Sequence, residues 1–534
     1  MPGPNSAPRS PSRAGLGSLL LAMVLFAAAC GGAATPASGK PAATTTAAAG
    51  PVAPNAQRNQ VVVMQGVDAN SLDPAFTTAT TDTNVVENVM EGLVGLDAQD
   101  QVVPLLATSW NLVNPTTWRF TLRAGVHFQD GEALDAAAVK YSFDRMADPA
   151  LKARVSALKE INFAAAKVVN ATTVDIVTKT PEPLLLQYLP QVYMLPPTYY
   201  QSHPESYLAS HPMGTGPYRF VSWVRNQAIT LQAWSGYWGT PAPIKSVIFK
   251  PEPEVSTQMD SLKLGETDII TGLTPDQLAT VKAFPDATVK AVQSGRDVFI
   301  GISTTRPYLA DPRVRQALNY AVDWASIQQS LLHGYGQRMG SIVIGHNVNP
   351  AVQPYPYDPA KARALLAAAN FPMGQQLVLD TPTGRYTDDQ QIAQVVASDL
   401  QKVGLAVTVR PLAWPVYVTM RNVKRNPDDL WLLGLGSSYT AQQNLDYVSP
   451  QLFVNVTGWN DPQYNSLFAQ LSQTFDPAKR KQLAYQLQTI VHDQAPWIFL
   501  WQQYDFYGVN KQLNWQPRSD EAVFLQGASW AKGG

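Results

Sequence analysis

Cysteine is the scarcest residue in this chain, with Cys30 alone among 534 residues. A single thiol forms no intramolecular disulfide and supplies no thiolate metal cluster. Charged residues are also few, at 15% with a formal net charge of -1, and they form no long basic or acidic run. Nothing therefore marks a surface for nucleic acid or for an anionic membrane.

Enzyme motifs are missing as well. The six histidines form no pair at the helical spacing of a metal site, and the chain has neither a GxSxG elbow nor a P-loop. The sequence thus calls for no cofactor and no metal. Paired carboxylates for glycoside hydrolysis stay open, because the distances between Asp and Glu side chains are not visible in a sequence. A secreted glycosidase- or peptidase-like hydrolase is therefore the alternative to a binding protein.

Apolar residues make up 45% of the chain and aromatic residues 10%. This composition, at this length, is enough for several buried cores and predicts more than one domain.

The N-terminus has the layout of a secretory signal. Arg9 and Arg13 precede an apolar run over 16–29, which ends in three alanines at 27–29. The run is shorter than the about 20 residues that a transmembrane helix needs. We therefore expect a signal peptide over 1–29 that is cleaved before Cys30.

Cys30 at the cleavage point resembles the cysteine of a bacterial lipobox, whose thiol is acylated. Ala27 stands where a lipobox usually has Leu, and the alternative is an ordinary signal peptide with an incidental cysteine. A catalytic role is disfavoured, because a signal region has no folded pocket with a base. The stretch 30–57 is rich in Ala, Thr and Pro and predicts a flexible linker. The expected location is extracytoplasmic, with the protein anchored by lipid to the cell membrane, on its periplasmic side or at the cell surface.

Strands and helices alternate irregularly beyond residue 61. In TWRFTLRAGVHF, Trp118, Phe120 and Leu122 alternate with polar residues, as in a half-buried strand, and a turn follows at 130–131. Helices are predicted where Asp precedes Pro, at the pairs 311–312, 358–359 and 476–477. This mixture favours α/β or α+β domains.

Several segments together resemble the family 5 extracellular solute-binding proteins, which are the oligopeptide, dipeptide and nickel-type receptors of ABC importers. They occur in the family's order along nearly the whole chain beyond the linker. The segments are VVENVMEGLVGLDAQDQVVPLLATSW, TWRFTLRAGVHFQDGEALDAAAVKYSFDR, HPMGTGPYRF, AWSGYWG, SLKLGETDI, DPRVRQALNYAVD, YDPAKARALLAAANF and DPAKRKQLAYQLQTIVHDQAPWIFLW.

The resemblance implies an α/β fold of the two-lobed periplasmic-binding-protein type, class II, with an extra accessory domain. The first lobe would comprise 58–100, 213–300 and 496–534, the accessory domain 101–212, and the second lobe 301–495. The chain would cross between the lobes near GISTT and near WIFLW, at residues 301–305 and 497–501.

The implied function is capture of a peptide or other small oligomeric solute between the lobes and its delivery to an ABC permease with its ATPases. The receptor itself would be a monomer without enzymatic activity. Ligand contacts present only in the closed state would drive closure of the two lobes. A metal chelate is a further alternative within the family, with His346, His492 or Tyr439 as its contacts.

The stretch GLGSSYT, 434–440, resembles the family's Gly-Trp-x-x-Asp-Tyr motif, whose acid pairs with a peptide ammonium. Gly434 and Tyr439 are kept, but Leu435 replaces the Trp and Ser438 replaces the Asp. A buried ammonium without a counter-charge loses hydration that a neutral hydroxyl does not replace. We therefore expect Gly436, Ser438 and Tyr439 to face a neutral ligand, or a peptide held by another acid.

Other candidate ligand contacts are aromatic residues and one arginine. Trp414, Tyr417 and Trp459 suit apolar side chains or sugar rings, although each also fits a core. Arg385 precedes a helix predicted to begin near residue 388. It would hold a ligand carboxylate through two hydrogen bonds, or else pair with a neighbouring aspartate of its own loop.

Phe76 ends the loop NSLDPAF, 70–76, which follows the first predicted strand and would line the cleft. In the alternative reading of this loop, Asn70 and Asp73 stabilise a turn.

Overall fold

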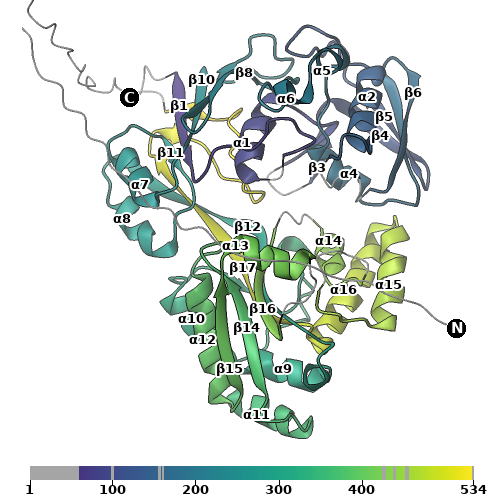
Figure 1. The fold of residues 1–534 in the computed structure, drawn as a ribbon. Coiled ribbons are helices and arrows are strands. Elements are labelled where there is room, and N and C mark those ends of the chain that lie inside the picture. The colour runs from purple at the N-terminus through teal and green to yellow at the C-terminus, as the bar shows by residue number, and fades with distance from the viewer. Residues whose placement is uncertain are drawn as a thin grey trace, which may run out of the picture. The chain divides into compact units, whose positions relative to one another are not determined.

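The computed structural model describes residues 59–77, 79–97, 101–153, 158, 161–423, 428–436, 440–450 and 456–531, with backbone only at 422 and 423. These residues contain an eleven-stranded mixed sheet in the order β15-β14-β16-β12-β17-β11-β1-β10-β9-β8, with β13 paired to β17 (Figure 1). The strands are β1 Gln60–Gln65, β8 Tyr218–Val224, β9 Ala228–Ala233, β10 Ser246–Pro251, β11 Ile269–Ile270, β12 Ala287–Ile302, β13 Gln337–Arg338, β14 Gln376–Pro382, β15 Ala406–Leu412, β16 Leu430–Leu435 and β17 Trp497–Asn510.

Two long antiparallel strands, β12 and β17, run through the middle of this sheet and join two hydrophobic cores. Val292 packs against one core and Val298 belongs to the other. The pairing of β12 with β17 shifts its register between Gln293 and Asp297, where a bulge interrupts the ladder. At this bulge the chain therefore passes from one hydrophobic core to the other. The crossings expected near 301–305 and 497–501 remain a prediction, and Ile302 and residues 497–501 pack in the second core.

The first core lies beneath β1, β8, β9 and β10, and the helix α1 covers it. Val61 and Val63 of β1 are fully buried, as expected for a strand with neighbours on both sides. The helices that flank this part of the sheet are α1 Thr80–Val89, α7 Val255–Lys263 and α8 Leu278–Lys282.

A separate four-stranded antiparallel sheet has the order β4-β5-β7-β6 and packs against α2. The predicted strand over 117–122 is confirmed, with Phe120 and Leu122 buried and Thr121 exposed. The predicted turn at 130–131 is also confirmed. Gly131 has a positive φ of 94°, which glycine adopts without strain. The elements of this sheet and its helix are β4 Ala107–Asn114, β5 Thr117–Leu122, α2 Ala136–Ala147, β6 Phe163–Asn170 and β7 Thr173–Thr178. The helices α4 Leu185–Tyr188, α5 Pro197–Ser202 and α6 Glu205–Leu208 follow in the chain.

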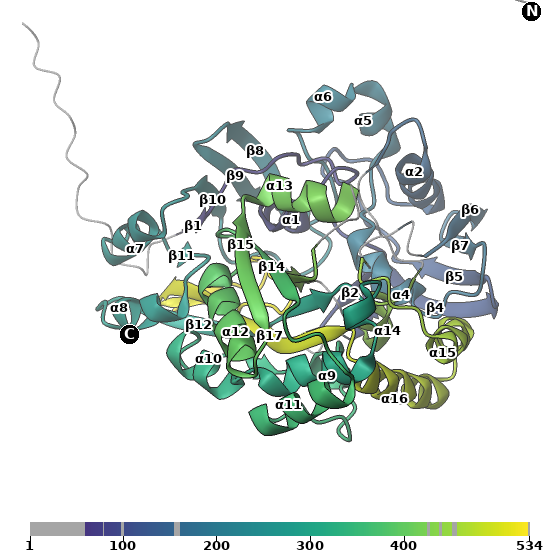
Figure 2. The same cartoon turned by 60° about the horizontal axis from the view of Figure 1, so that its bottom comes forward.

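Helices cover the other end of the large sheet, around β14 and β15, and α15 lies beside α16 (Figure 2). The three predicted Asp-Pro starts are confirmed at α9, α11 and α16, where each Asp side chain accepts a backbone N–H of the first turn. The helices are α9 Pro312–Ala321, α10 Trp324–Ser330, α11 Pro359–Ala368, α12 Asp389–Lys402, α13 Trp414–Val418, α14 Ala441–Asp446, α15 Pro462–Gln473 and α16 Pro477–Gln494.

Two short antiparallel pairs complete the strands of the described ranges, β2 Val94–Leu96 with β3 Val102–Pro104, and β18 Leu513–Asn514 with β19 Ser529–Trp530. Within the residues that the structure describes, no helix is both long and apolar enough to cross a membrane. The domain boundaries given above remain a prediction.

Candidate functional site

A cavity of about 590 Å³ opens beside the crossing strands. Its lining comes from the loop before α12, from Arg296 on β12, from Gln503 on β17 and from Glu521 near the C-terminus. A smaller cavity of about 220 Å³ shares four of these lining residues, namely Gly272, Thr387, Gln503 and Glu521. The two cavities therefore adjoin at the point where the chain passes from one core to the other.

The loop between β14 and α12 holds Arg385 at the rim of the larger cavity. The Asp389 carboxylate accepts backbone N–H groups of Gly384, Arg385 and Tyr386 at 3.2, 2.8 and 3.1 Å. Asp388, which precedes the helix, has a positive φ of 51°. The Asp389 carboxylate thus fixes the backbone of this loop. The Arg385 side chain is exposed and lines the cavity.

Aromatic rings support the Arg385 guanidinium. Its Cζ lies 5.2 Å from the Tyr386 ring centroid and 5.3 Å from that of Trp414. Trp414 in turn stacks on Tyr417 at 5.8 Å. Tyr417 is fully buried and its hydroxyl donates to the Leu432 carbonyl. Tyr417 thus fixes the ring that supports Arg385, and its own side chain presents no surface to the cavity.

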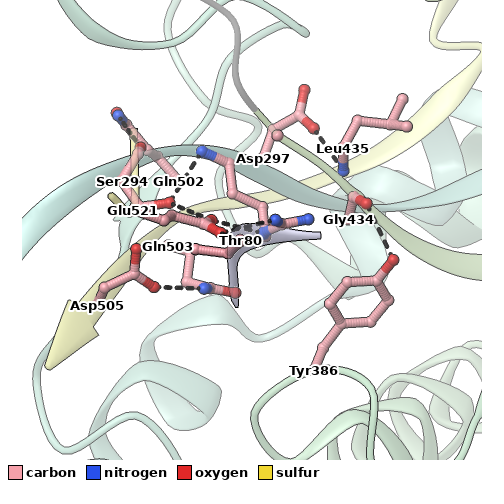
Figure 3. A network of polar contacts seen from close by, with 12 residues as sticks. Thr80, Ser294, Asp297, Tyr386, Gly434, Leu435, Gln502, Gln503, Asp505 and Glu521 are labelled. Carbon is pink, nitrogen blue, oxygen red and sulfur yellow. Dashed lines mark hydrogen bonds and ion pairs between the residues drawn. The ribbon is translucent and has the colours of Figure 1, made fainter. Parts of the chain in front are cut away.

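Glycines at the end of β16 bring this strand close to the same side chains. The Tyr386 hydroxyl donates to the Gly434 carbonyl at 2.9 Å (Figure 3). A Cβ at Gly434 would lie 2.8 Å from the Tyr386 ring, and one at Gly436 would lie 2.9 Å from the Cζ of Arg296. Only glycine allows such close approach. The predicted contacts Ser438 and Tyr439 follow directly in sequence but lie outside the described residues, as does Cys30.

Arg296 and Glu521 form an ion pair through two hydrogen bonds at 3.0 and 3.1 Å. Their side chains are 13% and 19% exposed, so the pair is largely shielded from water. Burial disfavours the charged guanidinium, but the Glu521 carboxylate outweighs this and raises the pKa of Arg296. Hydroxyls of Thr80 and Ser294 also donate to Glu521, both at 3.4 Å (Figure 3).

Asp505 lies next to this pair, on β17, and lines the smaller cavity. Its Oδ1 accepts from the Gln503 amide at 2.8 Å, while its Oδ2 is buried and has no hydrogen-bond partner of good geometry among the described residues (Figure 3). Burial, and then the charge of Glu521, raise the pKa of Asp505 to about 6. The Gln503 amide, the charge of Arg296 and the Ser294 hydroxyl partly offset this shift.

A second buried acid, Asp297, lies under the end of β16. Its Oδ1 accepts from the Leu435 N–H at 3.2 Å, and its Oδ2 has no partner within the described part of the chain. Burial raises its pKa to about 8. Asp297 is fully buried and is therefore uncharged near neutral pH.

Two other predicted contacts lie away from this group. Trp459 is only 5% exposed and packs in the second core against Tyr464, with their rings 4.9 Å apart. Phe76 packs beside the core of the four-stranded sheet. In the same loop Asp73 accepts from the Ala75 N–H, as expected for a turn, and also binds Arg145.

Sequence reasoning missed Arg296, Glu521, Asp505 and Gln503. The one local signal was an acid between two aromatic residues, at Asp505 in the segment WQQYDFYG. Arg296 and Glu521 are 225 residues apart, and nothing in the sequence joins them.

Histidines take part in the scaffold of the second core. The Nδ1 of His492 lies 2.7 Å from the Gly340 carbonyl, and its ring stacks on Tyr355. His346 lines a further cavity of about 550 Å³, which also touches the β12 bulge at Ser294 and Gly295. Among the described residues no three His, Cys, Asp or Glu side chains gather as metal ligands would.

Solved structures with the same fold define the class. The chain matches the periplasmic binding protein DppA from Helicobacter pylori in complex with the peptide STSA, with a TM-score of 0.75, 22% identity, and coverage of 88% of this chain and 98% of that one. It also matches NikZ from Campylobacter jejuni in complex with Ni(L-His), with a TM-score of 0.74, 22% identity and coverage of 88% and 98%. The fold is that of the two-lobed periplasmic binding proteins.

The family follows from the sequence match. Residues 101–483 match the model of the bacterial extracellular solute-binding proteins, family 5. The chain is also 28% identical over 457 residues to the glutathione-binding protein GsiB from Escherichia coli, covering 82% of this chain and 88% of that protein. This chain belongs to the family 5 extracellular solute-binding proteins.

Proposed function

We propose that this protein captures a peptide or similar small oligomeric solute beside its crossing strands and delivers it to the permease of an ABC importer. The observation that carries the proposal is the cavity of about 590 Å³, which is lined by the exposed guanidinium of Arg385 and by the buried Arg296–Glu521 pair. A concave polar site with a free guanidinium suits a ligand that ends in a carboxylate. The peptide and glutathione named for the relatives support the same ligand class.

In this proposal Arg385 binds the ligand carboxylate and Trp414 provides an apolar wall beside it. Gly436 is a further proposed ligand contact, as are Ser438 and Tyr439, which lie outside the described residues. Tyr417, whose side chain is buried, holds the wall in place, and Trp459, which is buried against Tyr464, makes no direct contact. The ligand needs no cofactor and no metal ion, and the protein acts as a monomer.

Ligand capture is tested on the purified protein with glutathione and a defined mixture of dipeptides to pentapeptides. A ligand present at 100 times its Kd should raise the unfolding free energy by about 2.7 kcal/mol. Mass spectrometry then reads the bound compound. An intact peptide supports a receptor, whereas a chemically altered one supports the hydrolase alternative. Failure of glutathione and every peptide to bind would contradict the proposed function.

Membrane attachment is a separate part of the proposal. The signal peptide over 1–29 would be removed and Cys30 acylated, with 30–57 as the linker to the folded part. Cys30→Ser should move the protein from the membrane fraction to the soluble fraction of the cells that secrete it. Continued membrane attachment of this variant would contradict acylation at Cys30.

A further inference from the structure

We propose that Asp505, assisted by Glu521, binds the ammonium group of the ligand. This inference rests on the proposed function and specifies its ligand as a solute that carries both a carboxylate and an ammonium. Ser438 cannot supply the counter-charge that an ammonium requires, so another acid must do so.

Asp505 has a carboxylate whose hydrogen bonding is incomplete within the described residues. It lines the cavity of about 220 Å³, and its Oδ2 is buried without a hydrogen-bond partner of good geometry among the described residues. Buried carboxylate oxygens are nearly always hydrogen-bonded, and an exception beside a cavity indicates a missing donor. An ammonium carries three N–H donors and a positive charge.

The charges around the cavity favour a cation. Arg296 and Glu521 neutralise each other through two hydrogen bonds. Ionised Asp505 therefore leaves one uncompensated negative charge at this point. Glu521 contributes a second carboxylate within the same cavity lining, close enough to raise the pKa of Asp505. A ligand cation would remove this unfavourable interaction between two carboxylates.

Asp297 is the competing acid, because it lies beside Leu435 in the ladder with β16. Its side chain is fully buried, however, and its pKa of about 8 keeps it protonated at neutral pH. Asp505 lines a cavity, whereas Asp297 has no exposed surface. Asp297 is therefore a matched control for Asp505.

The position of Asp505 relative to Arg385 fits one ligand with two charged ends. Arg385 lines the larger cavity and Asp505 the smaller one, and the two cavities share Gln503 and Glu521. A short peptide has a carboxylate at one end and an ammonium at the other, so it would engage both residues at once.

The test compares each peptide that binds in the mixture with its N-acetylated form, by titration calorimetry on the full chain. Acetylation removes the positive charge and leaves the carboxylate. Wild-type protein should lose about 10- to 100-fold in affinity on acetylation, as expected for a charge-assisted hydrogen bond. Asp505→Asn should bind both forms equally, and Asp297→Asn should discriminate like wild type. Thermal unfolding without ligand checks that both variants are folded.

The outcomes separate the two proposals. Peptides that bind with the same affinity before and after acetylation overturn the inference and leave the proposed function intact. If Asp505→Asn still binds free peptides more tightly than acetylated ones, the inference is also overturned. If Asp297→Asn loses this preference, the ammonium is bound by Asp297. If neither glutathione nor any peptide binds wild-type protein, the proposed function fails together with the inference.

Discussion

Two buried arginine–carboxylate pairs in this molecule have nearly the same geometry and different surroundings. Arg145 binds Asp73 at 3.0 and 2.6 Å, and Arg296 binds Glu521 at 3.0 and 3.1 Å. The side chains of the first pair are 9% and 0% exposed, and the Asp73 carboxylate also accepts the Ala75 N–H. The second pair lines the larger cavity and lies beside Asp505, whose Oδ2 has no hydrogen-bond partner of good geometry in the described residues.

The comparison indicates how a scaffold differs from a binding site when both contain buried charge. The Arg145–Asp73 pair is satisfied within the chain and fixes the loop 70–76 against α2. Beside the Arg296–Glu521 pair, the Asp505 carboxylate leaves charge and hydrogen-bonding capacity at a cavity. Removing a member of the first pair should therefore affect stability, and changes around the second should affect ligand binding.

The largest expected effect is on the first pair. Asp73→Ala leaves the Arg145 guanidinium buried and unpaired, which should lower the unfolding free energy by about 3–5 kcal/mol in urea denaturation. Lys140→Ala, which removes an exposed pair with Asp144, is the control and should change it by less than about 0.5 kcal/mol. Equal losses in the two variants would contradict the scaffold role of Asp73.

The next effect concerns the ligand carboxylate. Arg385→Ala should weaken binding of peptides with a free C-terminus by about 10- to 100-fold, measured by calorimetry. The melting temperature of this variant should equal that of wild type, because the Arg385 side chain is exposed. Arg313→Ala removes another exposed arginine, which pairs with Asp311, and should leave affinity as it is. Peptide amides should bind wild-type protein as weakly as they bind the Arg385 variant.

A smaller effect follows from the pKa of Asp505, which is about 6. The charged form binds an ammonium, so affinity should be constant above pH 7 and fall about tenfold between pH 7 and pH 5. The charged or titratable groups that influence Asp505 are Glu521, Arg296 and Tyr507. In Asp505→Asn the affinity should no longer depend on pH over this range. If the affinity of the variant still falls as in wild type, another group causes the pH dependence.

The last effect concerns the pH dependence of stability at Asp297. Its folded pKa of about 8 lies above its ordinary value, so between about pH 4 and pH 8 the unfolded chain releases a proton that the folded chain keeps. Stability conferred by the protonated form is thus lost as the pH rises. In urea denaturation, Asp297→Asn should gain unfolding free energy steadily relative to wild type as the pH rises from 5 to 8. A gain that shrinks as the pH rises would contradict this assignment.

Local features of the fold were predictable because their causes are local. The Asp-Pro pairs at 311, 358 and 476 begin helices, since the carboxylate caps the first turn and the proline needs no donor. The pair Asp461–Pro462 carries the same signal and begins α15, although it was not among the predicted starts. The two-lobed fold was predicted from a family resemblance.

The site was predictable only in part. Arg385, Trp414 and Gly436 lie around the Tyr386 ring and the Arg296 side chain, and their role as ligand contacts remains a prediction. The acids beside them were not foreseen, because Glu521 reaches β12 through a pairing of residues 225 positions apart. Asp505 lies between Tyr504 and Phe506 in β17, and its cavity depends on neighbours from distant segments.

The most direct test of the account is a crystal structure of the protein with a bound tripeptide. We expect the peptide carboxylate on the Arg385 guanidinium and the ammonium within hydrogen-bond distance of the Asp505 carboxylate. A peptide seated in the cavity lined by His346, or one whose ammonium lies away from both Asp505 and Glu521, would contradict it.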